Sequence, residues 1–465
     1  MINRARPFAL MGPQDQRRLV AAGFALIGVL LLATVGSSSF EGFEAALESA
    51  KGDIVRQLLL GTLFLVLLGV AGPVAMLPGH RRGWLSWLPL PVSIILLLVY
   101  CLISVSWAIA PAVSLRRFIF TAMVIWILFR AVAELGYART LQLVRWTLIV
   151  VLVANYASLL VPGVGLQPDS PGGDPSVVGN WRGLLPHKNL AGAVCAFTIL
   201  FFLFDRRSVP PYLSVALVAA SAIFLHFSQS KTSQGILFVA ILTGLVIRPY
   251  STHYRALLGP LLFMTAGLLL LLVPLYIEDA SALLNDPEAL TGRSQIWPIL
   301  VTYASEHPLT GAGFGSFWQI GQEGPIWDFT SGWIAQYAGH GHNGYLDMLV
   351  TIGAPGLAIV IVALFLWPAM RLLLSHAISR DCRALLLSLL FFCAGHNLTE
   401  TSLMDRISVV QVFLMLTIAL IYVQSQASPG RHHQLRGRSL GLFARSPVRQ
   451  PVRAPVRRRP VGRPR

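Results

Sequence analysis

The sequence has little charge. Only 12% of its 465 residues are Asp, Glu, Lys or Arg, whereas 55% are hydrophobic. Soluble globular proteins carry roughly 25% charged residues, so about half of the usual solubilising charge is absent. This deficit excludes a soluble globular protein of ordinary composition.

Cysteine is scarce as well. The sequence contains four cysteines and no Cys-x-x-Cys pair. This spacing excludes both a disulfide framework and a thiolate metal site. We therefore expect four buried, inert thiols.

Long apolar runs dominate the chain in place of charge. Runs of about 18 residues or more are typical of transmembrane helices. We therefore predict an all-α fold, a polytopic membrane helix bundle of about 12 transmembrane helices within a membrane domain at 19–425. The runs lie near 19–36, 57–77, 85–105, 117–134, 141–161, 189–204, 211–228, 235–248, 257–276, 345–367, 384–397 and 407–424.

Basic residues in the short loops predict the orientation of the bundle. If residues 1–18 form a cytoplasmic N-terminus, the loops rich in Arg all fall on the cytoplasmic side, as the positive-inside rule requires. We therefore expect a multi-pass protein of the bacterial inner membrane with both termini in the cytoplasm. Residues 277–344 then form one long periplasmic loop between helices 9 and 10.

The net charge of +16 is concentrated in the C-terminal tail, where residues 431–465 contain eleven Arg and no Asp or Glu. Segments with this composition cannot form a core, so we predict that residues 426–465 are a disordered, Arg- and Pro-rich cytoplasmic tail that contacts membrane lipids. The tail lacks interleaved aromatic residues and a folded nucleic-acid-binding domain, so we do not expect nucleic acid as a partner.

Several cations break the charge rule, because they fall on the predicted outer side. Charges near membrane spans are costly and usually face a cavity or an anionic partner. Their distribution over separate loops predicts a site for an anion with more than one charge; scattered residues that snorkel to the interface are the alternative. The cations are Arg116, Arg117, Arg182, Lys188, Lys231 and Arg293, and His187, His340, His342, His396 and Arg406 share their side.

His342 is the candidate base, because a neutral imidazole can accept a proton from an attacking hydroxyl. The alternative is a histidine that caps the following helix. His340 and His342 lack a third ligand at a convincing spacing, and the sequence has no Asp-x-Asp pair. We therefore predict no metal and no cofactor, with Arg and Lys neutralising a leaving phosphate.

Three glycines at 311, 313 and 315 resemble a nucleotide-binding loop, but they do not open a helix after a strand. We interpret Gly311–Gly315 as a tight turn in which the backbone approaches substrate or another segment.

Over roughly residues 85–425, the chain resembles the bacterial O-antigen ligase and polysaccharide polymerase superfamily, particularly its exopolysaccharide-polymerisation branch. The resemblance depends on the order and spacing of short motifs. These are Ser106-Trp107, Ser114-Leu115-Arg116-Arg117, Trp181-Arg182-Gly183, His187-Lys188-Asn189, Ser228-Gln229-Ser230-Lys231-Thr232, Thr291-Gly292-Arg293, His307-Pro308-Leu309, His342-Asn343 and Asn397-Leu398-Thr399-Glu400.

The resemblance implies a metal-independent membrane glycosyltransferase whose active site faces the periplasm. Its donor would be an oligosaccharide linked to undecaprenyl pyrophosphate, and its acceptor a glycan hydroxyl. The resemblance also implies the site residues: His342 and Arg293 would be catalytic, with His342 orienting or deprotonating the acceptor. Arg293 and Lys231 would grip the pyrophosphate, with Arg182, Lys188, Arg116 and Arg117 as further candidates. Many ligases have Arg where this chain has Lys231. The Lys ammonium is a point charge and cannot form the bidentate hydrogen bonds of a guanidinium.

The leading hypothesis is a polymerase of exopolysaccharide or O-antigen repeat units. The alternatives are a ligase that moves finished glycan onto lipid A-core, and a transporter or flippase for the lipid carrier. A flippase would need internal repeats or cations across the membrane midplane, and we find neither in the sequence. Whether a chain-length regulator is a further partner stays open.

Overall fold

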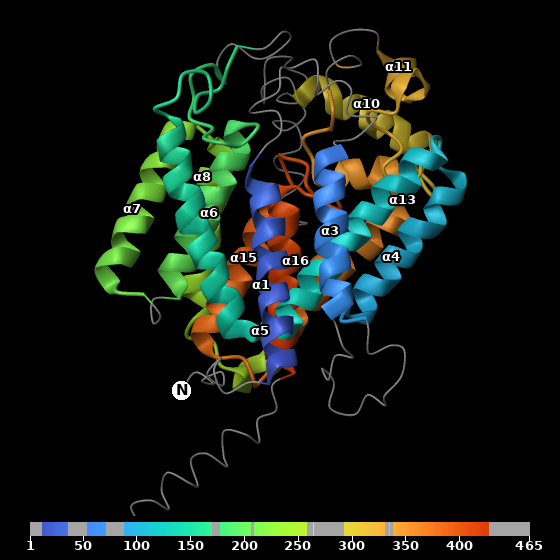
Figure 1. Ribbon diagram of the computed structural model, residues 1–465. Helices are drawn as coiled ribbons and strands as arrows, with labels where there is room; N and C mark the ends of the chain where they lie inside the picture. The colour runs from blue at the N-terminus through green and yellow to red at the C-terminus, as the bar shows by residue number, and fades with distance from the viewer. Residues whose placement is uncertain are drawn as a thin grey trace, which may run out of the picture. The chain divides into compact units, whose positions relative to one another are not determined.

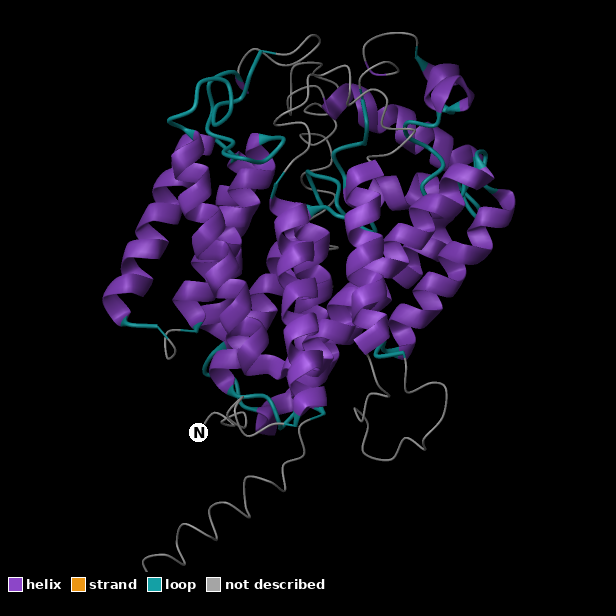
Figure 2. Ribbon diagram, viewed as in Figure 1, coloured by secondary structure: helices purple, strands orange, loops and turns teal. Residues whose placement is uncertain are grey.

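The computed structural model describes residues 12–35, 54–70, 88–169, 177–205, 209–257, 264, 293–330, 334 and 338–426, without the side chains of 294 and 322. Within these ranges the fold is helical and contains no strand, and a single isolated bridge pairs Leu166 with Trp181 (Figure 2). The predicted all-α fold is confirmed. The α-helices are α1 (Pro13–Thr34), α3 (Ile54–Val70), α4 (Val92–Ser104), α5 (Pro111–Ser158), α6 (Lys188–Phe204), α7 (Pro211–Ser228), α8 (Lys231–Ile247), α10 (Arg293–Glu306), α11 (Ile326–Phe329), α13 (Gly344–Ile361), α14 (Trp367–Leu374), α15 (Arg380–His396) and α16 (Val409–Ser425).

Four of the described helical stretches are long and apolar enough to cross a membrane: Pro13–Thr34, Pro111–Ser158, Pro211–Ser228 and Gly344–Leu374. Several shorter apolar helices accompany them. Several predicted segments lie wholly or largely outside the described residues. They are the run at 257–276 except for 257 and 264, residues 1–11 of the N-terminus, residues 277–292, 331–333 and 335–337 of the loop, and the tail after 426. The count of about 12 spans and the extent of the long loop therefore stay predictions.

Two glycines break the longest helices. Helix α5 has 48 residues, but Gly136 within it has φ 70° and ψ 171°, so two helices meet there end to end. This break lies between the runs predicted at 117–134 and 141–161. Helix α13 breaks in the same way at Gly353, where φ is 69° and a Cβ atom would lie 2.2 Å from the carbonyl oxygen of Leu309. Only glycine adopts this backbone without strain, so the break lets the loop after α10 lie against α13.

Helix packing separates buried from peripheral helices (Figure 1). Helix α16 packs on α5 and α15, and its residues from Val409 to Tyr422 are buried. In α3 only Leu60 and Leu67 are buried, although the helix is apolar apart from Arg56, Gln57 and Thr62. A helix that is apolar on every side is either a core helix or one that faces lipid. Helix α16 is of the first kind, and α3 has the apolar outer surface of the second.

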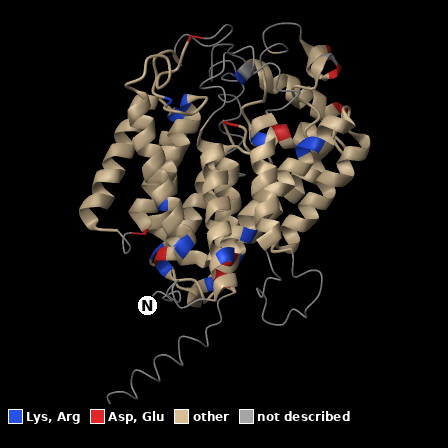
Figure 3. Ribbon diagram, viewed as in Figure 1, with Lys and Arg blue, Asp and Glu red and all other residues tan. Residues whose placement is uncertain are grey.

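The charged residues lie mostly near the ends of the helices (Figure 3). At one end, Arg145 pairs with Asp205 at 2.7 Å and Arg248 pairs with Asp381 at 3.0 Å. Helix α6 ends there and helix α15 starts there. The opposite ends of these two helices are at Lys188 and His396. The candidate site lies at this second end. Which side of the membrane each end faces stays a prediction.

All four cysteines are buried and free, as expected.

Candidate functional site

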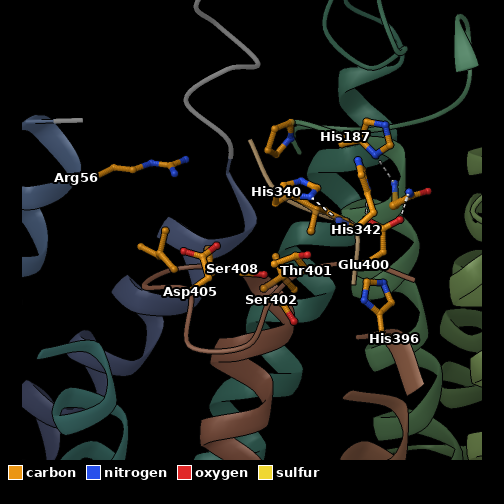
Figure 4. Close-up of a pocket in the computed structure, with 16 residues that line it drawn as sticks. Arg56, His187, His340, His342, His396, Glu400, Thr401, Ser402, Asp405 and Ser408 are labelled. Atoms are coloured by element: carbon orange, nitrogen blue, oxygen red, sulfur yellow. Dashed lines mark hydrogen bonds and ion pairs between the residues drawn. The ribbon is translucent and has the colours of Figure 1, made fainter. Parts of the chain in front are cut away.

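A cavity of about 340 Å³ opens where α6 begins and α15 ends. Its wall combines the start of α6, the loop before α13, the loop between α15 and α16, and Arg56 from α3 (Figure 4). The lining includes Arg56, His187, Asn189, His340, His342, His396, Glu400, Thr401, Ser402, Asp405 and Ser408. Four histidines from three separate segments therefore meet around one glutamate.

The loop after α15 is folded around the side chain of Asn397. Its Oδ1 accepts hydrogen bonds from the backbone N–H of Ser402 at 2.9 Å and of Leu403 at 3.2 Å. Its Nδ2 donates to the carbonyl oxygen of Cys393 at 2.8 Å. One amide side chain thus replaces the backbone bonds that the helix end leaves unmade, and the resulting turn directs Glu400 into the cavity.

Glu400 is the central contact of the site. Its Oε1 accepts hydrogen bonds from Arg293 Nη2 at 2.5 Å and from Asn189 Nδ2 at 2.6 Å. Its Oε2 lies 3.4 Å from His342 Nδ1. Burial acts to raise the pKa of the Glu400 carboxyl, but the contact with His342 and the charge of Arg293 outweigh burial and hold that pKa well below its usual value. The carboxylate is therefore ionised at neutral pH.

A buried carboxylate fixes the backbone that presents His342. Asp347 accepts hydrogen bonds from the N–H of Gly341 at 3.0 Å and 3.1 Å, from Trp318 Nε1 at 2.7 Å and from the hydroxyl of Thr401. His342 itself has φ 50°, in the left-handed region that non-glycine residues rarely occupy. Such strain persists where the surroundings impose it, and here Asp347 supplies the restraint.

His342 does not cap α13. Asn343 is the N-cap, and its Oδ1 accepts hydrogen bonds from the N–H groups of Tyr345 at 3.0 Å and Leu346 at 3.1 Å. The alternative role considered for His342 was therefore wrong, because the next residue performs it. The side chain of His342 is 34% exposed, so it remains accessible from the cavity.

The two neighbouring histidines are kept neutral. His187 caps α6, and its Nδ1 accepts a hydrogen bond from the N–H of Asn189 at 3.2 Å. Burial lowers the pKa of His187 to about 4 and the pKa of His340 to about 3, against the opposing charge of Glu400. Both rings are therefore uncharged at pH 7.

Of the predicted cations, Arg293 lies in the site and two others lie beside it. Lys188 begins α6, with its Nζ 3.4 Å from the carbonyl oxygen of Gln229. Lys231 begins α8 and is exposed. The next residue, Thr232, has its hydroxyl 2.8 Å from that of Thr399, in the loop that carries Glu400. The start of α8 therefore adjoins the site. None of the three cations lines the cavity, and Arg293 reaches it through its bond to Glu400.

Two further predicted cations hold loops. Arg182 is buried and donates to the carbonyl oxygens of Val164 at 3.1 Å and Pro186 at 3.4 Å. Arg117 donates to the carbonyl oxygens of Gly315 at 2.6 Å and Trp318 at 2.8 Å. Arg116, which precedes it in α5, is partly buried and does not line the cavity.

The turn at Gly311–Gly315 brings two backbones together, as the sequence predicted. All three glycines have positive φ, and a Cβ atom on Gly313 would lie 2.3 Å from Ala108 Cα. The partner of the turn is another protein segment, the residues before α5.

Sequence reasoning gave no role to Glu400, Asp347 or Arg56. Glu400 had a detectable signal, since it stands in a recognised motif and is one of only 20 acidic residues in the chain. Within the described part of the chain, no three His, Cys, Asp or Glu side chains are placed to hold a metal ion. Independence from metal stays a prediction.

A comparison with protein families matches residues 190–361 to the family described as O-antigen ligase. The matched region runs from α6 into α13 and includes Lys231, Arg293 and His342. It confirms the resemblance that the motifs indicated, and Glu400 lies beyond it. No curated protein matches the chain.

Proposed function

Because residues 190–361 match the O-antigen ligase family, we propose that this protein is a membrane glycosyltransferase of the ligase and polymerase type. Its donor is a glycan on undecaprenyl pyrophosphate, its acceptor is a glycan hydroxyl, and the cavity faces the periplasm of a bacterial inner membrane. The contact of Glu400 with both Arg293 and His342 carries the proposal, because it places a base and a cation on one carboxylate.

The proton chemistry depends on His342. Its Nδ1 faces Glu400 Oε2 at 3.4 Å, so the carboxylate favours the tautomer with the proton on Nδ1 and leaves Nε2 as the basic nitrogen. In the proposed step, Nε2 accepts the proton of the acceptor hydroxyl while its oxygen bonds to the anomeric carbon. Glu400 stabilises the imidazolium that results.

The leaving group is the lipid-linked pyrophosphate. The bond between the anomeric carbon and the phosphate oxygen breaks, its electron pair stays on that oxygen, and this single displacement inverts the anomeric configuration. A guanidinium has five N–H donors. Arg293 uses one nitrogen on Glu400, and its Nε has no hydrogen-bond partner among the described residues, so Arg293 is suited to hold the carboxylate and a phosphate oxygen together.

We assign additional phosphate contacts to Lys231 and Lys188, because each begins a helix beside the cavity and helix N-termini favour anions. Arg182 and Arg117 contribute to phosphate binding indirectly, because they hold the loops whose carbonyl oxygens they bind. Arg116 acts with Arg117 at the start of α5.

We propose polymerisation of exopolysaccharide or O-antigen repeat units as the reaction. The alternative is the ligase reaction, which the description of the matched family favours. A glycan profile of a strain lacking the protein separates them. Single repeat units on the lipid carrier without long polymer indicate a polymerase, and long lipid-linked chains that never reach their acceptor indicate a ligase.

The same strain tests the catalytic assignment. Complementation with His342→Ala should leave the profile of the deletion strain unchanged while the protein accumulates normally in the membrane. Normal polymer from that variant would remove His342 from the mechanism, and repeat units trapped on the cytoplasmic face of the deletion strain would replace the transferase with a flippase.

A further inference from the structure

His396 is buried at the cavity without a partner for its ring. It is the last residue of α15, its side chain is 1% exposed, and it lines the cavity below Glu400 (Figure 4). Neither Nδ1 nor Nε2 has a hydrogen-bond partner among the described residues. Buried polar groups are nearly always bonded, and an unbonded one costs free energy, so this ring requires an explanation.

The loop that follows His396 does not explain why its ring is unbonded. The polar groups next to His396 bond to each other. Asn397 Nδ2 donates to the carbonyl oxygen of Cys393, and the hydroxyl of Ser402 donates to Asn397 Oδ1 at 3.0 Å. The backbone N–H of Glu400 donates to the carbonyl oxygen of His396 at 3.0 Å. That bond fixes His396 one helical turn before Glu400, so the position of the ring is set by the backbone and not by a bond of its own.

The chemistry of this part of the cavity suits a neutral, hydroxyl-rich ligand. Besides His396, its lining contributes the hydroxyl groups of Thr401, Ser402 and Ser408, and the Ser408 hydroxyl also lacks a partner among the described residues. Two carboxylates line the cavity on the same loop, Glu400 before these hydroxyl groups and Asp405 among them, and both repel phosphate. A sugar hydroxyl donates and accepts at once, so it can satisfy an imidazole and a serine together.

We propose that His396 forms the floor of the acceptor subsite, where its ring hydrogen-bonds a hydroxyl of the acceptor sugar and positions that sugar under His342. This inference rests on the proposed function. His342 and His396 lie on either side of Glu400 in Figure 4, and all three line the same cavity, so we place one sugar ring beside Glu400 against both. His396 is a binding and positioning residue and exchanges no proton in the reaction.

The test uses the full-length protein in lipid nanodiscs. The donor is the lipid-linked repeat unit extracted from a strain that lacks the protein. The varied acceptor is the same repeat unit released from its carrier by mild acid, which has the sugar hydroxyls and no pyrophosphate. Transfer to this soluble acceptor gives its KM and kcat separately.

Three variants are compared with the wild type. His396→Leu should raise the KM for the soluble acceptor roughly tenfold, change kcat less than about twofold, and keep or raise the thermal midpoint, because replacing an unbonded polar ring with an apolar side chain removes a cost of folding. His396→Gln, which keeps a donor and an acceptor, should have an intermediate KM. His226→Leu, at an exposed histidine near the end of α7, is the control and should leave all three values unchanged.

An unchanged KM in an active His396→Leu protein would overturn the inference. So would a lowered thermal midpoint or failure of His396→Leu to accumulate in the membrane, because either result assigns His396 a structural role. Absence of transfer by the wild type would reject the proposed function itself, which distinguishes that failure from failure of the inference.

Discussion

The guanidinium of Arg293 and the carboxylate of Glu400 form an ion pair at 2.5 Å, although 107 positions separate them in the sequence. Arg293 opens α10 and Glu400 lies in the loop between α15 and α16. The pair therefore joins the region matched by the family model to a loop beyond it. Both side chains are nearly buried, with 13% and 11% exposed, and breaking one partner of a buried pair leaves the other charge uncompensated.

Replacing Glu400 with Gln should abolish most glycosyl transfer while preserving the shape of the side chain. The neutral amide cannot stabilise the His342 imidazolium or balance Arg293, so we expect the rate to fall about 100-fold or more, the range seen for general acid–base groups. The measurement is polymer formed per membrane-inserted protein. Glu306→Gln, at the exposed end of α10, is the matched control. Activity in Glu400→Gln equal to that control would show that the carboxylate has no part in the chemistry.

Stability should fall in mild acid because of His187 and His340. Both have a folded-state pKa below the ordinary 6.5, at about 4 and about 3. Between those values and 6.5 the unfolded chain binds protons that the folded protein does not, so the stabilising contribution is complete above pH 6.5 and is lost progressively as pH falls toward 4 and 3. The thermal midpoint of the purified protein should decline over this interval.

The substitution His187→Asn measures how much of this decline in thermal midpoint comes from His187. Asn is a good N-cap, so His187→Asn keeps the cap of α6 and removes the titrating ring. The loss of thermal midpoint between pH 6.5 and 4 should become smaller in this variant and stay the same in His226→Asn, at an exposed site. Identical pH profiles for all three proteins would contradict a neutral, buried His187.

Asp347→Asn should loosen the backbone at His342. The carboxylate accepts bonds from Gly341, Trp318 and Thr401, whereas an amide offers a single acceptor oxygen. Leaving buried donors unsatisfied costs about 1–3 kcal/mol each, so the thermal midpoint and the transfer rate should both decrease. Asp328→Asn, at an exposed carboxylate in α11, controls for loss of charge. Should the two variants behave alike, the carboxylate of Asp347 would not be what restrains the loop.

Gly313→Ala should destabilise the protein more than Gly321→Ala. The two glycines have nearly the same φ, 88° and 87°. A Cβ atom on Gly313 would lie 2.3 Å from Ala108 Cα, whereas one on Gly321 would meet nothing within 4 Å. Left-handed backbone alone costs roughly 1–2 kcal/mol for a residue with a side chain, and the steric clash adds to it only at Gly313. Equal thermal midpoints would mean that the close approach to Ala108 can relax.

The sequence allowed the helical fold to be predicted, and it pointed to two residues, His342 and Arg293, that meet at Glu400. Apolar runs mark helices because a membrane span needs about 20 apolar residues. His342 stood out just before the run at 345–367, and Arg293 stood out as a cation in the predicted periplasmic loop. The roles of Arg182 and Arg117 could not be predicted, because a guanidinium binds a ligand or its own loop according to a tertiary path that spacing does not reveal. Glu400 was missed for the same reason, since its partners Asn189, Arg293 and His342 come from three other segments.

The position of Glu400 late in the chain also bears on biosynthesis. A nascent chain that has been made through α13 already contains Arg293 and His342, but it has no carboxylate between them. The contacts of the cavity become complete only after α15 and the loop that follows it have left the ribosome. Under the proposed function, a chain that stops between the end of α13 and position 400 should therefore enter the membrane but transfer no glycan.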